Sequence, residues 1–254
     1  MKNTAASLDQ LRKPWPGGAG MKVLELFAGS RSIGKEAEKQ GHRVISLDIE
    51  PFERIDLVMS ILDFQLHHLT EPPDFIWASV PCTTYSMLAI RLHRRGSKPV
   101  SEAAVLADRI VVHTLSIIRE AGCLFVMENP RAALRKMPFM RGLDRRTVMY
   151  CRYGDTRMKP TDLWGNIFYS LMNPNGYQPR PICFNENPHC HHERSPRYTT
   201  LKARGDYHTG GTVMMKDAYE RSKLPPLLCS EIISSAAYQW RERLSSIHAH
   251  HSHD

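Results

Sequence analysis

Short apolar runs alternate with segments of helical periodicity from Met21 onward. The runs KVLELF, HRVISLD and DFIWASV predict buried strands, and the long periodic segment after them predicts a helix that Ser101 caps and Gly122 ends. The predicted strands are residues 22–27, 42–48, 57–60, 74–80, 123–129 and 146–154, and the predicted helices are residues 32–41, 101–122 and 224–247. This alternation predicts an α/β fold with a Rossmann-like, doubly wound, mostly parallel sheet.

Three segments lack this pattern. Residues 1–20 are rich in Pro and Gly, which predicts a flexible N-terminal arm. Residues 167–217 are rich in Pro, Asn, His and Arg with almost no apolar period, which predicts a small irregular insertion. The end of the chain, HAHHSHD at 248–254, is expected to be disordered. The ordered body is therefore expected in residues 21–166 and 218–247.

Composition narrows the possible partners. The 254 residues are 42% hydrophobic and 24% charged, as in an ordinary globular protein. No apolar run approaches the ~20 residues that span a bilayer, and the N-terminus lacks the apolar stretch of a secretory signal, so we expect a cytoplasmic protein. A net charge of +8 favours an anionic partner, of which nucleic acid is the commonest. The six cysteines are too sparse for a disulfide framework.

Candidate chemistry gathers where the predicted strands end. The turn in LELFAGSRSIG lets the backbone approach a ligand, and Asp48 ends the next strand, which suits a nucleoside cofactor. The later strands deliver Pro81–Cys82 and Glu128–Asn129 to the same edge. Taken singly, a cysteine at a strand end is more often inert packing and a glutamate an ion-pair partner. Their predicted co-location favours a thiol and a carboxyl group acting together at a cofactor crevice.

The same residues carry a family resemblance. The order of LELFAGSRSIG, SLDIE, ILDF, DFIWASVPCTTYS and FVMENP resembles the carbon-5 cytosine DNA methyltransferases, particularly the short forms of phages and prophages. The likeness covers residues 21–166 and resumes at RSKLPPLLCSEII. It implies a class I S-adenosylmethionine methyltransferase fold whose catalytic domain is residues 21–166 plus 218–247, with 167–217 as target-recognition region. It further implies a monomer in the cytoplasm of a bacterial or phage-infected cell.

The resemblance also implies site residues. Cys82 would add to carbon 6 of cytosine, Glu128 would act as the acid at ring nitrogen 3, and Pro81 and Asn129 would shape the site. The pocket for S-adenosylmethionine would comprise Phe27, Ala28, Gly29, Ser30, Asp48, Ile49, Asp63 and Phe64. The substrate would be DNA whose target cytosine is flipped out or single-stranded. A free thiol with a pKa near ~8.5 is only slightly ionised at neutral pH, so a nearby positive charge or a helix N-terminus should help, and the candidate charges are Arg131, Arg152 and Arg157.

Several positions depart from the family pattern. Arg31–Ser32 replaces a glycine pair, Val80 replaces a proline, and Pro130 follows Glu128–Asn129. The Gln-x-Arg-x-Arg segment is absent, and CRYGDTRMKPTDLWGN takes its place. The candidate contacts to bases or phosphates are Arg157, Lys159, Arg180, Arg194, Arg197 and Arg204. The alternative for the insertion is a solvated basic loop.

The segment CFNENPHCHHERSPR crowds soft metal ligands into the insertion. A structural zinc ion held by Cys183, Cys190 and His191 is one interpretation, and a polar loop facing DNA is the other. For the whole chain three functions stay open: a DNA cytosine carbon-5 methyltransferase, an RNA cytosine methyltransferase that acts on a transfer-RNA-like substrate, and a non-catalytic DNA-binding relative.

Overall fold

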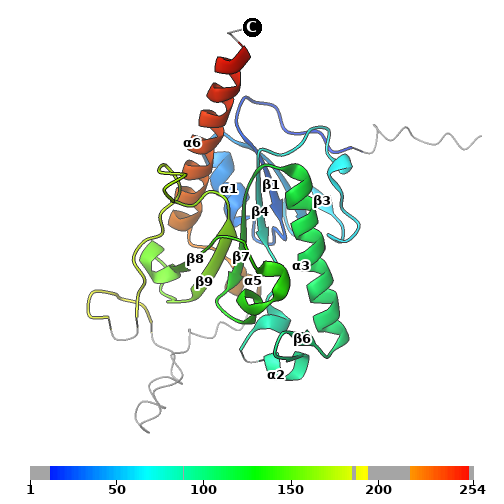
Figure 1. Cartoon of the computed structure of the whole chain (residues 1–254), viewed down its shortest axis with the longest axis vertical. Coiled ribbons are helices and arrows are strands. Elements are labelled where there is room, and N and C mark those ends of the chain that lie inside the picture. Colours follow the sequence, from blue (N-terminus) through cyan, green and yellow to red (C-terminus); the bar gives the residue numbers. More distant parts are fainter. Residues whose placement is uncertain (1–11, 88, 185–186, 194–217, 252–254) are drawn as a thin grey trace, which may run out of the picture.

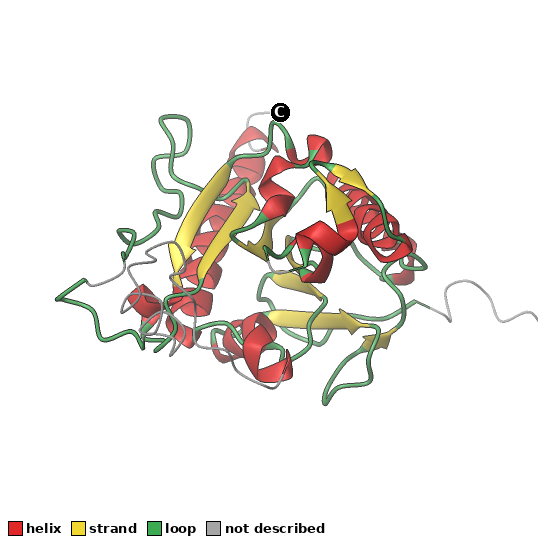
Figure 2. Cartoon of the chain, turned by 90° about the horizontal axis from the view of Figure 1, so that it is seen from below, coloured by secondary structure: helices red, strands yellow, loops and turns green. Residues whose placement is uncertain are grey.

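The computed structural model describes residues 12–87, 89–184, 187–193 and 218–251, and it contains a seven-stranded sheet with helices on both faces (Figures 1 and 2). The strand order is β3-β2-β1-β4-β7-β9-β8, in which only β9 runs against the other strands. The strands are β1 (Lys22–Leu26), β2 (Arg43–Asp48), β3 (Leu57–Val58), β4 (Phe75–Ser79), β7 (Leu124–Pro130), β8 (Arg145–Met149) and β9 (Pro160–Gly165). The predicted α/β fold with a Rossmann-like, mostly parallel sheet is confirmed.

The two faces of the sheet carry separate cores. α3 (Glu102–Ala121) covers one face, and α1 (Ser32–Lys39) together with α6 (Pro226–His251) covers the other (Figure 1). Alternating residues of β1 serve both cores, because neighbouring side chains of a strand point to opposite faces: Leu24 packs on the α3 side and Val23 on the α1–α6 side. Burial on both faces explains why the strands read as nearly continuous apolar runs.

Helix α3 has the ends that its sequence predicts. The Ser101 hydroxyl accepts a hydrogen bond of 3.2 Å from the Ala104 N–H, which satisfies one of the donors that a helix start leaves unpaired. Gly122 ends the helix in the left-handed conformation with φ of 59°. β7 begins two residues after Gly122, so the end of α3 determines the position of Glu128 along the sheet.

Smaller elements surround the sheet. They are the short helices η2 (Leu66–His68), η3 (Thr83–Tyr85), α2 (Ile90–His93), η4 (Ala133–Lys136), η5 (Pro138–Met140), η6 (Tyr150–Tyr153) and α5 (Ala218–Ser222), and the two-stranded ribbon β5 (Arg94–Arg95) and β6 (Lys98–Pro99). The predicted strand at 146–154 is β8 followed by η6. Strand β9 has no predicted counterpart, because it begins with a proline and carries a buried charged residue, Asp162, which pairs with Arg135.

Within the segment 1–20 that is predicted to be a flexible arm, residues 12–15 contact the body of the protein. The Lys13 N–H donates to the His68 carbonyl at 2.7 Å, and the buried Trp15 indole donates to the Glu71 carbonyl at 2.9 Å. A large aromatic side chain that packs on the body offsets the entropy of ordering its neighbours. Residues 1–11 lie outside the described part.

The predicted insertion and tail also differ from expectation. Ile167, Phe168 and Tyr177 are buried in the α1–α6 core, so the segment after β9 begins as part of the body rather than as a loop without a core. Helix α6 continues to His251, four residues into the segment predicted to be disordered. Residues 194–217 and 252–254 lie outside the described part. Among the described residues, no helix combines the length and apolarity that a bilayer crossing requires.

Candidate active site

The carboxyl ends of β1, β2, β4 and β7 surround a cavity of about 500 Å³. This is the edge at which ligands bind in open α/β sheets. The cavity is lined by Glu25, Phe27, Ala28, Gly29, Ser30, Ser32, Asp48, Phe52, Ser79, Val80, Pro81, Cys82, Thr83, Glu128, Pro130, Lys159, Tyr219, Ser222 and Leu224. The site residues predicted from the turn after β1, from the end of β2, and from Pro81–Cys82 and Glu128 therefore meet in one cavity.

The turn after β1 is tight. Phe27 and Gly29 have positive φ angles of 57° and 46°, and at 29 glycine adopts this conformation without strain. The Gly29 N–H donates a hydrogen bond of 2.8 Å to the carboxylate of Asp48, which joins the ends of β1 and β2. The turn consequently presents its backbone to the cavity, and Asp48 is both a wall residue and the anchor of the turn.

Glu25 is a site residue that the sequence analysis missed. Its buried carboxyl group accepts hydrogen bonds from the N–H groups of Ile33 (3.1 Å) and Gly34 (3.0 Å) at the start of α1. A β-carbon at position 34 would lie 2.6 Å from a Glu25 oxygen, so only glycine lets the helix approach this closely. Burial raises the pKa of Glu25 to about 7, although the Arg31 charge opposes this shift.

Cys82 and Glu128 occupy neighbouring strand ends. Cys82 follows β4, is partly exposed and lines the cavity, whereas Glu128 lies in β7, opposite Ser79 in the register, and is only 6% exposed. Burial raises the pKa of Glu128, while the positive charge of Lys159 acts in the opposite direction. The site therefore holds a reachable thiol and a carboxyl group that keeps its proton to higher pH than an exposed glutamate.

Asn129 contributes by positioning. Its buried side chain donates a hydrogen bond of 2.7 Å from Nδ2 to the carbonyl of Val80, two residues before Cys82. This bond links the end of β7 to the loop that carries the thiol. Of the predicted catalytic residues, Pro81, Cys82 and Glu128 line the cavity, and Asn129 holds the loop from behind.

Among the described residues, Lys159 is the one lysine or arginine that lines this cavity. The predicted candidates Arg131, Arg152 and Arg157 do not line it. It precedes β9, and its Nζ lies 4.7 Å from the centre of the Tyr150 ring. Burial lowers the pKa of Lys159, while the negative charges of Glu128 and Cys82 favour its protonated form. Coulombic attraction is mutual, so Lys159 in turn favours the thiolate of Cys82.

Three residues predicted to contact the cofactor lie away from the cavity. Ile49 is 65% exposed, Asp63 is exposed, and Phe64 is buried in the core beneath α3. Two aromatic residues that the sequence did not single out, Phe52 and Tyr219, line the cavity instead, with their ring centres 5.4 Å apart. Tyr219 belongs to α5, so its position depends on how the chain returns after residue 217.

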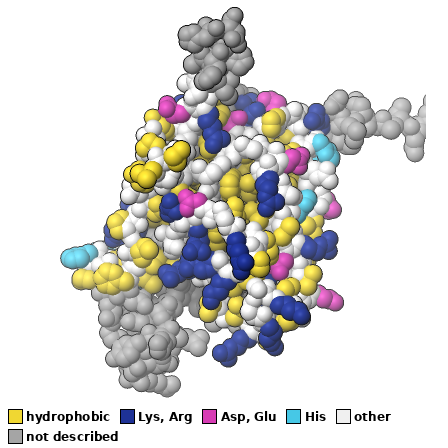
Figure 3. All heavy atoms as spheres, viewed as in Figure 1, with side chains coloured by type: hydrophobic (Ala, Val, Ile, Leu, Met, Phe, Trp, Pro, Cys, Tyr) yellow, Lys and Arg dark blue, Asp and Glu magenta, His cyan; other side chains and the backbone are white. Residues whose placement is uncertain are grey.

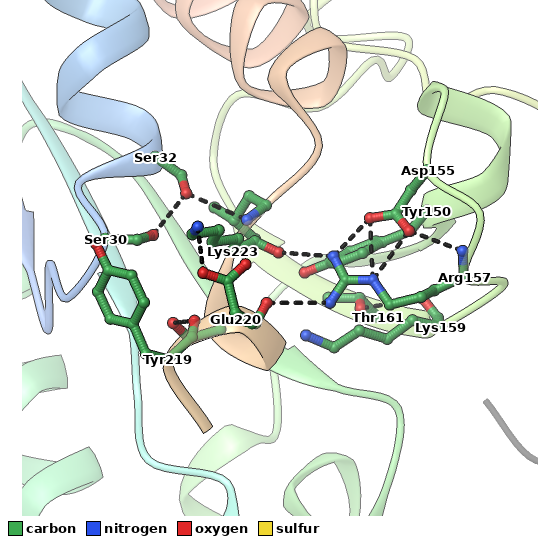
Figure 4. A network of polar contacts seen from close by, with 12 residues as sticks. Ser30, Ser32, Tyr150, Asp155, Arg157, Lys159, Thr161, Tyr219, Glu220 and Lys223 are labelled. Carbon is green, nitrogen blue, oxygen red and sulfur yellow. Dashed lines mark hydrogen bonds and ion pairs between the residues drawn. The ribbon is translucent and has the colours of Figure 1, made fainter. Parts of the chain in front are cut away.

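A network of polar contacts connects α5 to the body beside the cavity (Figure 4). The Arg157 guanidinium pairs with Asp155 and donates to the carbonyl of Lys223 at 3.1 Å. On the other side, the Leu224 N–H donates to the Ser32 hydroxyl at 3.2 Å. A second cavity of about 740 Å³ adjoins this network and shares Ser30, Ser32 and Leu224 with the first.

Two of the predicted nucleic-acid contacts are engaged within the protein. Arg157 is 8% exposed and serves the network just described. Arg180 forms an ion pair of 2.6 Å with Glu231 of α6, and one of its N–H groups donates to the Arg152 carbonyl. Both arginines therefore tie segments of the chain together. Arg194, Arg197 and Arg204 lie outside the described residues.

Cys183, Cys190 and His192 of the predicted metal segment lie close to a third cysteine, Cys151. The ligand atoms of Cys151, Cys183, Cys190 and His192 all lie within 4.8 Å of one another. This differs from the predicted set, because His192 rather than His191 joins the cluster, and because Cys151 comes from η6, far away in sequence.

The chain therefore has a Rossmann-like α/β sheet with a thiol and a buried carboxyl group in a cavity at the carboxyl edge of its strands. A comparison with protein-family models finds no matching family, and a comparison with curated proteins finds no match. Among solved structures, the chain is similar to the Entamoeba histolytica methyltransferase EhMeth, with 12% identity and a TM-score of 0.44. That similarity covers 60% of this chain and 55% of EhMeth.

A second similar structure is a triple mutant of Spodoptera frugiperda DNMT2, with 15% identity and a TM-score of 0.40. That similarity covers 63% of this chain and 53% of the DNMT2 chain. The matched region spans about half the length of either protein.

Proposed function

We propose that this protein transfers a methyl group from S-adenosylmethionine to carbon 5 of cytosine in DNA, with Cys82 as the nucleophile. The observation that carries the proposal is that Cys82, Glu128 and the turn after β1 line the same cavity. The resemblance of the sequence around these residues to the carbon-5 cytosine methyltransferases points in the same direction. Each residue then has a task that its position allows.

The cavity fits the cofactor in size and chemistry. Its volume of about 500 Å³ lies in the range of small-molecule sites. The backbone of Phe27 to Ser30 would lie against the cofactor, the Asp48 carboxylate would accept from the ribose hydroxyls, and Phe52 and Tyr219 offer aromatic surface to the adenine. When bound, S-adenosylmethionine supplies a methyl group on a positively charged sulfur atom.

Carbon 5 of cytosine is too weak a nucleophile to take this methyl group unaided, and the two strand-end residues overcome that weakness. The Sγ of Cys82 adds to carbon 6, while Glu128 gives its proton to ring nitrogen 3, so that electron density moves to carbon 5. After methylation, carbon 5 loses its proton to water, the bond between sulfur and carbon 6 breaks, and ring nitrogen 3 returns its proton to Glu128. The thiolate and the carboxylic acid are both restored.

The surroundings favour the protonation states that this cycle needs. Glu128 holds its proton because burial raises its pKa. Lys159 places a positive charge on the wall of the same cavity, which favours a thiolate at Cys82. Asn129 fixes the loop that carries the thiol through its bond to Val80.

A basic surface on the segment that follows the Cys82 loop suits a nucleic-acid substrate. Lys and Arg side chains gather on the lower part of the face in Figure 3, where α2 and β6 lie in Figure 1. In this region Arg91, Arg95 and Lys98 are exposed, in the segment that follows the Cys82 loop. The exposed Met87 and Leu92 add apolar surface that could enter a base stack when the target nucleotide is flipped.

The decisive experiment is incubation with S-adenosylmethionine and DNA, followed by mass spectrometry of the digested nucleosides. Wild-type protein should produce 5-methylcytosine, and Cys82→Ser should reduce the yield by at least ~10³-fold. Cys123→Ser is the matched control, because Cys123 lies at the opposite end of β7 and burial raises its pKa to about 12. Equal yields from wild type and Cys82→Ser would refute the nucleophile.

A trapping experiment separates the DNA reaction from the alternatives. With 5-fluorocytosine in the substrate, carbon 5 carries no proton to lose, so the Cys82 adduct should accumulate on DNA and survive denaturation. Adduct formation only on RNA would favour the RNA methyltransferase. Binding of DNA without any adduct or methylated product would favour the non-catalytic relative.

A further inference from the structure

A second constellation of reactive side chains lies outside the proposed active site. Cys151 of η6, Cys183, Cys190 and His192 each offer one ligand atom, and all four atoms lie within 4.8 Å of one another. Nδ1 of His192 is 3.2 Å from Sγ of Cys190 and 3.6 Å from Sγ of Cys183. The three cysteines are thiols rather than half-cystines.

The four ligand atoms are close enough together to surround one tetrahedral zinc ion after small side-chain adjustments. With zinc–sulfur bonds of about 2.3 Å and zinc–nitrogen bonds of about 2.0–2.1 Å, ligand atoms stand about 3.6–3.8 Å apart. Three thiolates and one imidazole form a ligand set that favours zinc over hard cations such as magnesium or calcium. Four protein ligands leave no open position, which is the pattern of structural rather than catalytic zinc.

Burial and hydrogen bonds from neighbouring groups hold two of the ligands in place. Cys183 is 1% exposed, and Nδ2 of Asn187 donates a hydrogen bond of 3.4 Å to its sulfur. The main-chain carbonyl of the same asparagine accepts a hydrogen bond of 3.2 Å from the Cys190 N–H. Asn187 thus orients two of the sulfur ligands, as the outer contacts of metal sites do.

The location of the cluster gives it a task. Cys151 stands between Arg152 and Tyr150, and the Tyr150 hydroxyl lies 3.4 Å from the carboxyl group of Glu128. The other three ligands belong to the segment 183–192, which forms turns without helices or strands in its described part. A metal ion held by both would cross-link this segment to η6, whose Tyr150 contacts the active-site residue Glu128.

We propose that Cys151, Cys183, Cys190 and His192 bind one zinc ion, which fixes the Cys/His-rich segment to the catalytic domain. The site is independent of the proposed methyl transfer, because none of the four residues lines the cavity at Cys82. Metal content and activity can therefore be read separately.

Metal analysis of the purified full-length chain tests the proposal. We expect about one zinc ion per wild-type chain by inductively coupled plasma mass spectrometry, and near-complete loss in Cys151→Ser and Cys183→Ser. Cys123→Ser should keep the metal. The comparison of His192→Ala, which should lose zinc, with His191→Ala, which should keep it, tests the choice between the adjacent histidines.

Two further measurements keep the proposal falsifiable if the serine variants fold poorly. His192→Cys should retain zinc, because it restores a fourth soft ligand. Cobalt(II) in place of zinc should give thiolate-to-cobalt charge-transfer bands, which distinguish this site from metal held only by the histidines of 248–253. Wild-type protein without stoichiometric zinc, a disulfide among the three cysteines, or charge-transfer bands that persist in Cys183→Ser would each overturn the proposal.

Discussion

The carboxyl edge of the sheet and the segment 167–193 are held by different kinds of contact. At the edge, parallel strands place Ser79 opposite Glu128 through a ladder of backbone hydrogen bonds. In the segment, side chains make the attachments: the Tyr177 hydroxyl meets that of Tyr153, and Arg180 pairs with Glu231. Backbone hydrogen bonds between strands persist through most substitutions, whereas a contact made by one side chain is lost when that residue is replaced. Mutations at the edge should therefore affect chemistry, and those in the segment should affect its placement.

The largest effect is expected from Glu128→Gln. Loss of the proton donor should lower the methylation rate by roughly 10²–10⁴-fold while the fold persists, because glutamine has nearly the same shape. In the wild type, burial raises the pKa of Glu128, so the acid form is present above pH 4.5 and activity should fall as pH rises through the raised pKa. Asp63→Asn is the control, since Asp63 lies outside the cavity, and a comparable loss there would contradict the assignment.

The next effect concerns stability against pH at the start of α1. The folded state holds the Glu25 proton up to about pH 7, whereas an exposed glutamate releases it near pH 4.5. The free energy of unfolding should therefore fall by about 3 kcal/mol as pH rises across that window, and Glu25→Gln should flatten this slope. Urea denaturation at a series of pH values measures it, with the exposed Glu120→Gln as control. If the pH dependence of the free energy of unfolding were the same in Glu25→Gln as in the wild type, Glu25 would not be its cause.

A smaller effect is expected from Lys159→Met. Without the positive charge on the cavity wall, the Cys82 thiolate is less favoured, so alkylation by iodoacetamide at fixed pH should slow about tenfold. Lys159→Arg should restore most of the rate, and Lys136→Met, at an exposed position, should leave it unchanged. If Lys159→Met were alkylated as fast as the wild type, Lys159 would not be the cation that favours the Cys82 thiolate, and the arginines would be the remaining candidates.

The smallest effect is expected in the segment itself. Tyr177→Phe removes a buried hydrogen bond of 2.7 Å to Tyr153 and should reduce stability by about 0.5–1.5 kcal/mol without changing the chemistry at Cys82. Tyr169→Phe, at a side chain that is 44% exposed, should have almost no effect. A loss of methylation as large as that of Glu128→Gln would mean that the segment acts directly in the reaction.

The regular part of the fold could be predicted from local patterns. Apolar runs and capping residues located the strands and α3, and the topology of a parallel sheet then brought Cys82 and Glu128 to one cavity. Strand β9 escaped prediction because Asp162 is paired with Arg135 inside the protein, so a charged residue interrupts the apolar pattern.

The missed residues share a different cause, since their partners are distant in sequence. Cys151 joins ligands more than thirty positions further along, and Tyr219 of α5 lines the cavity together with the turn after β1, about 190 positions earlier in the chain. Arg157 and Arg180 looked like surface charges, yet each has a carboxylate partner that the pattern of basic residues does not reveal. Side-chain pairing across the chain decides these roles.

The hydrogen bond from Leu224 to Ser32 spans 192 positions and joins two residues that line the cavity. During synthesis, the ribosome therefore delivers the thiol and the carboxyl group well before Tyr219, Ser222 and Leu224, which line the same cavity. Nascent chains shorter than about 218 residues would have the strand edge without this wall.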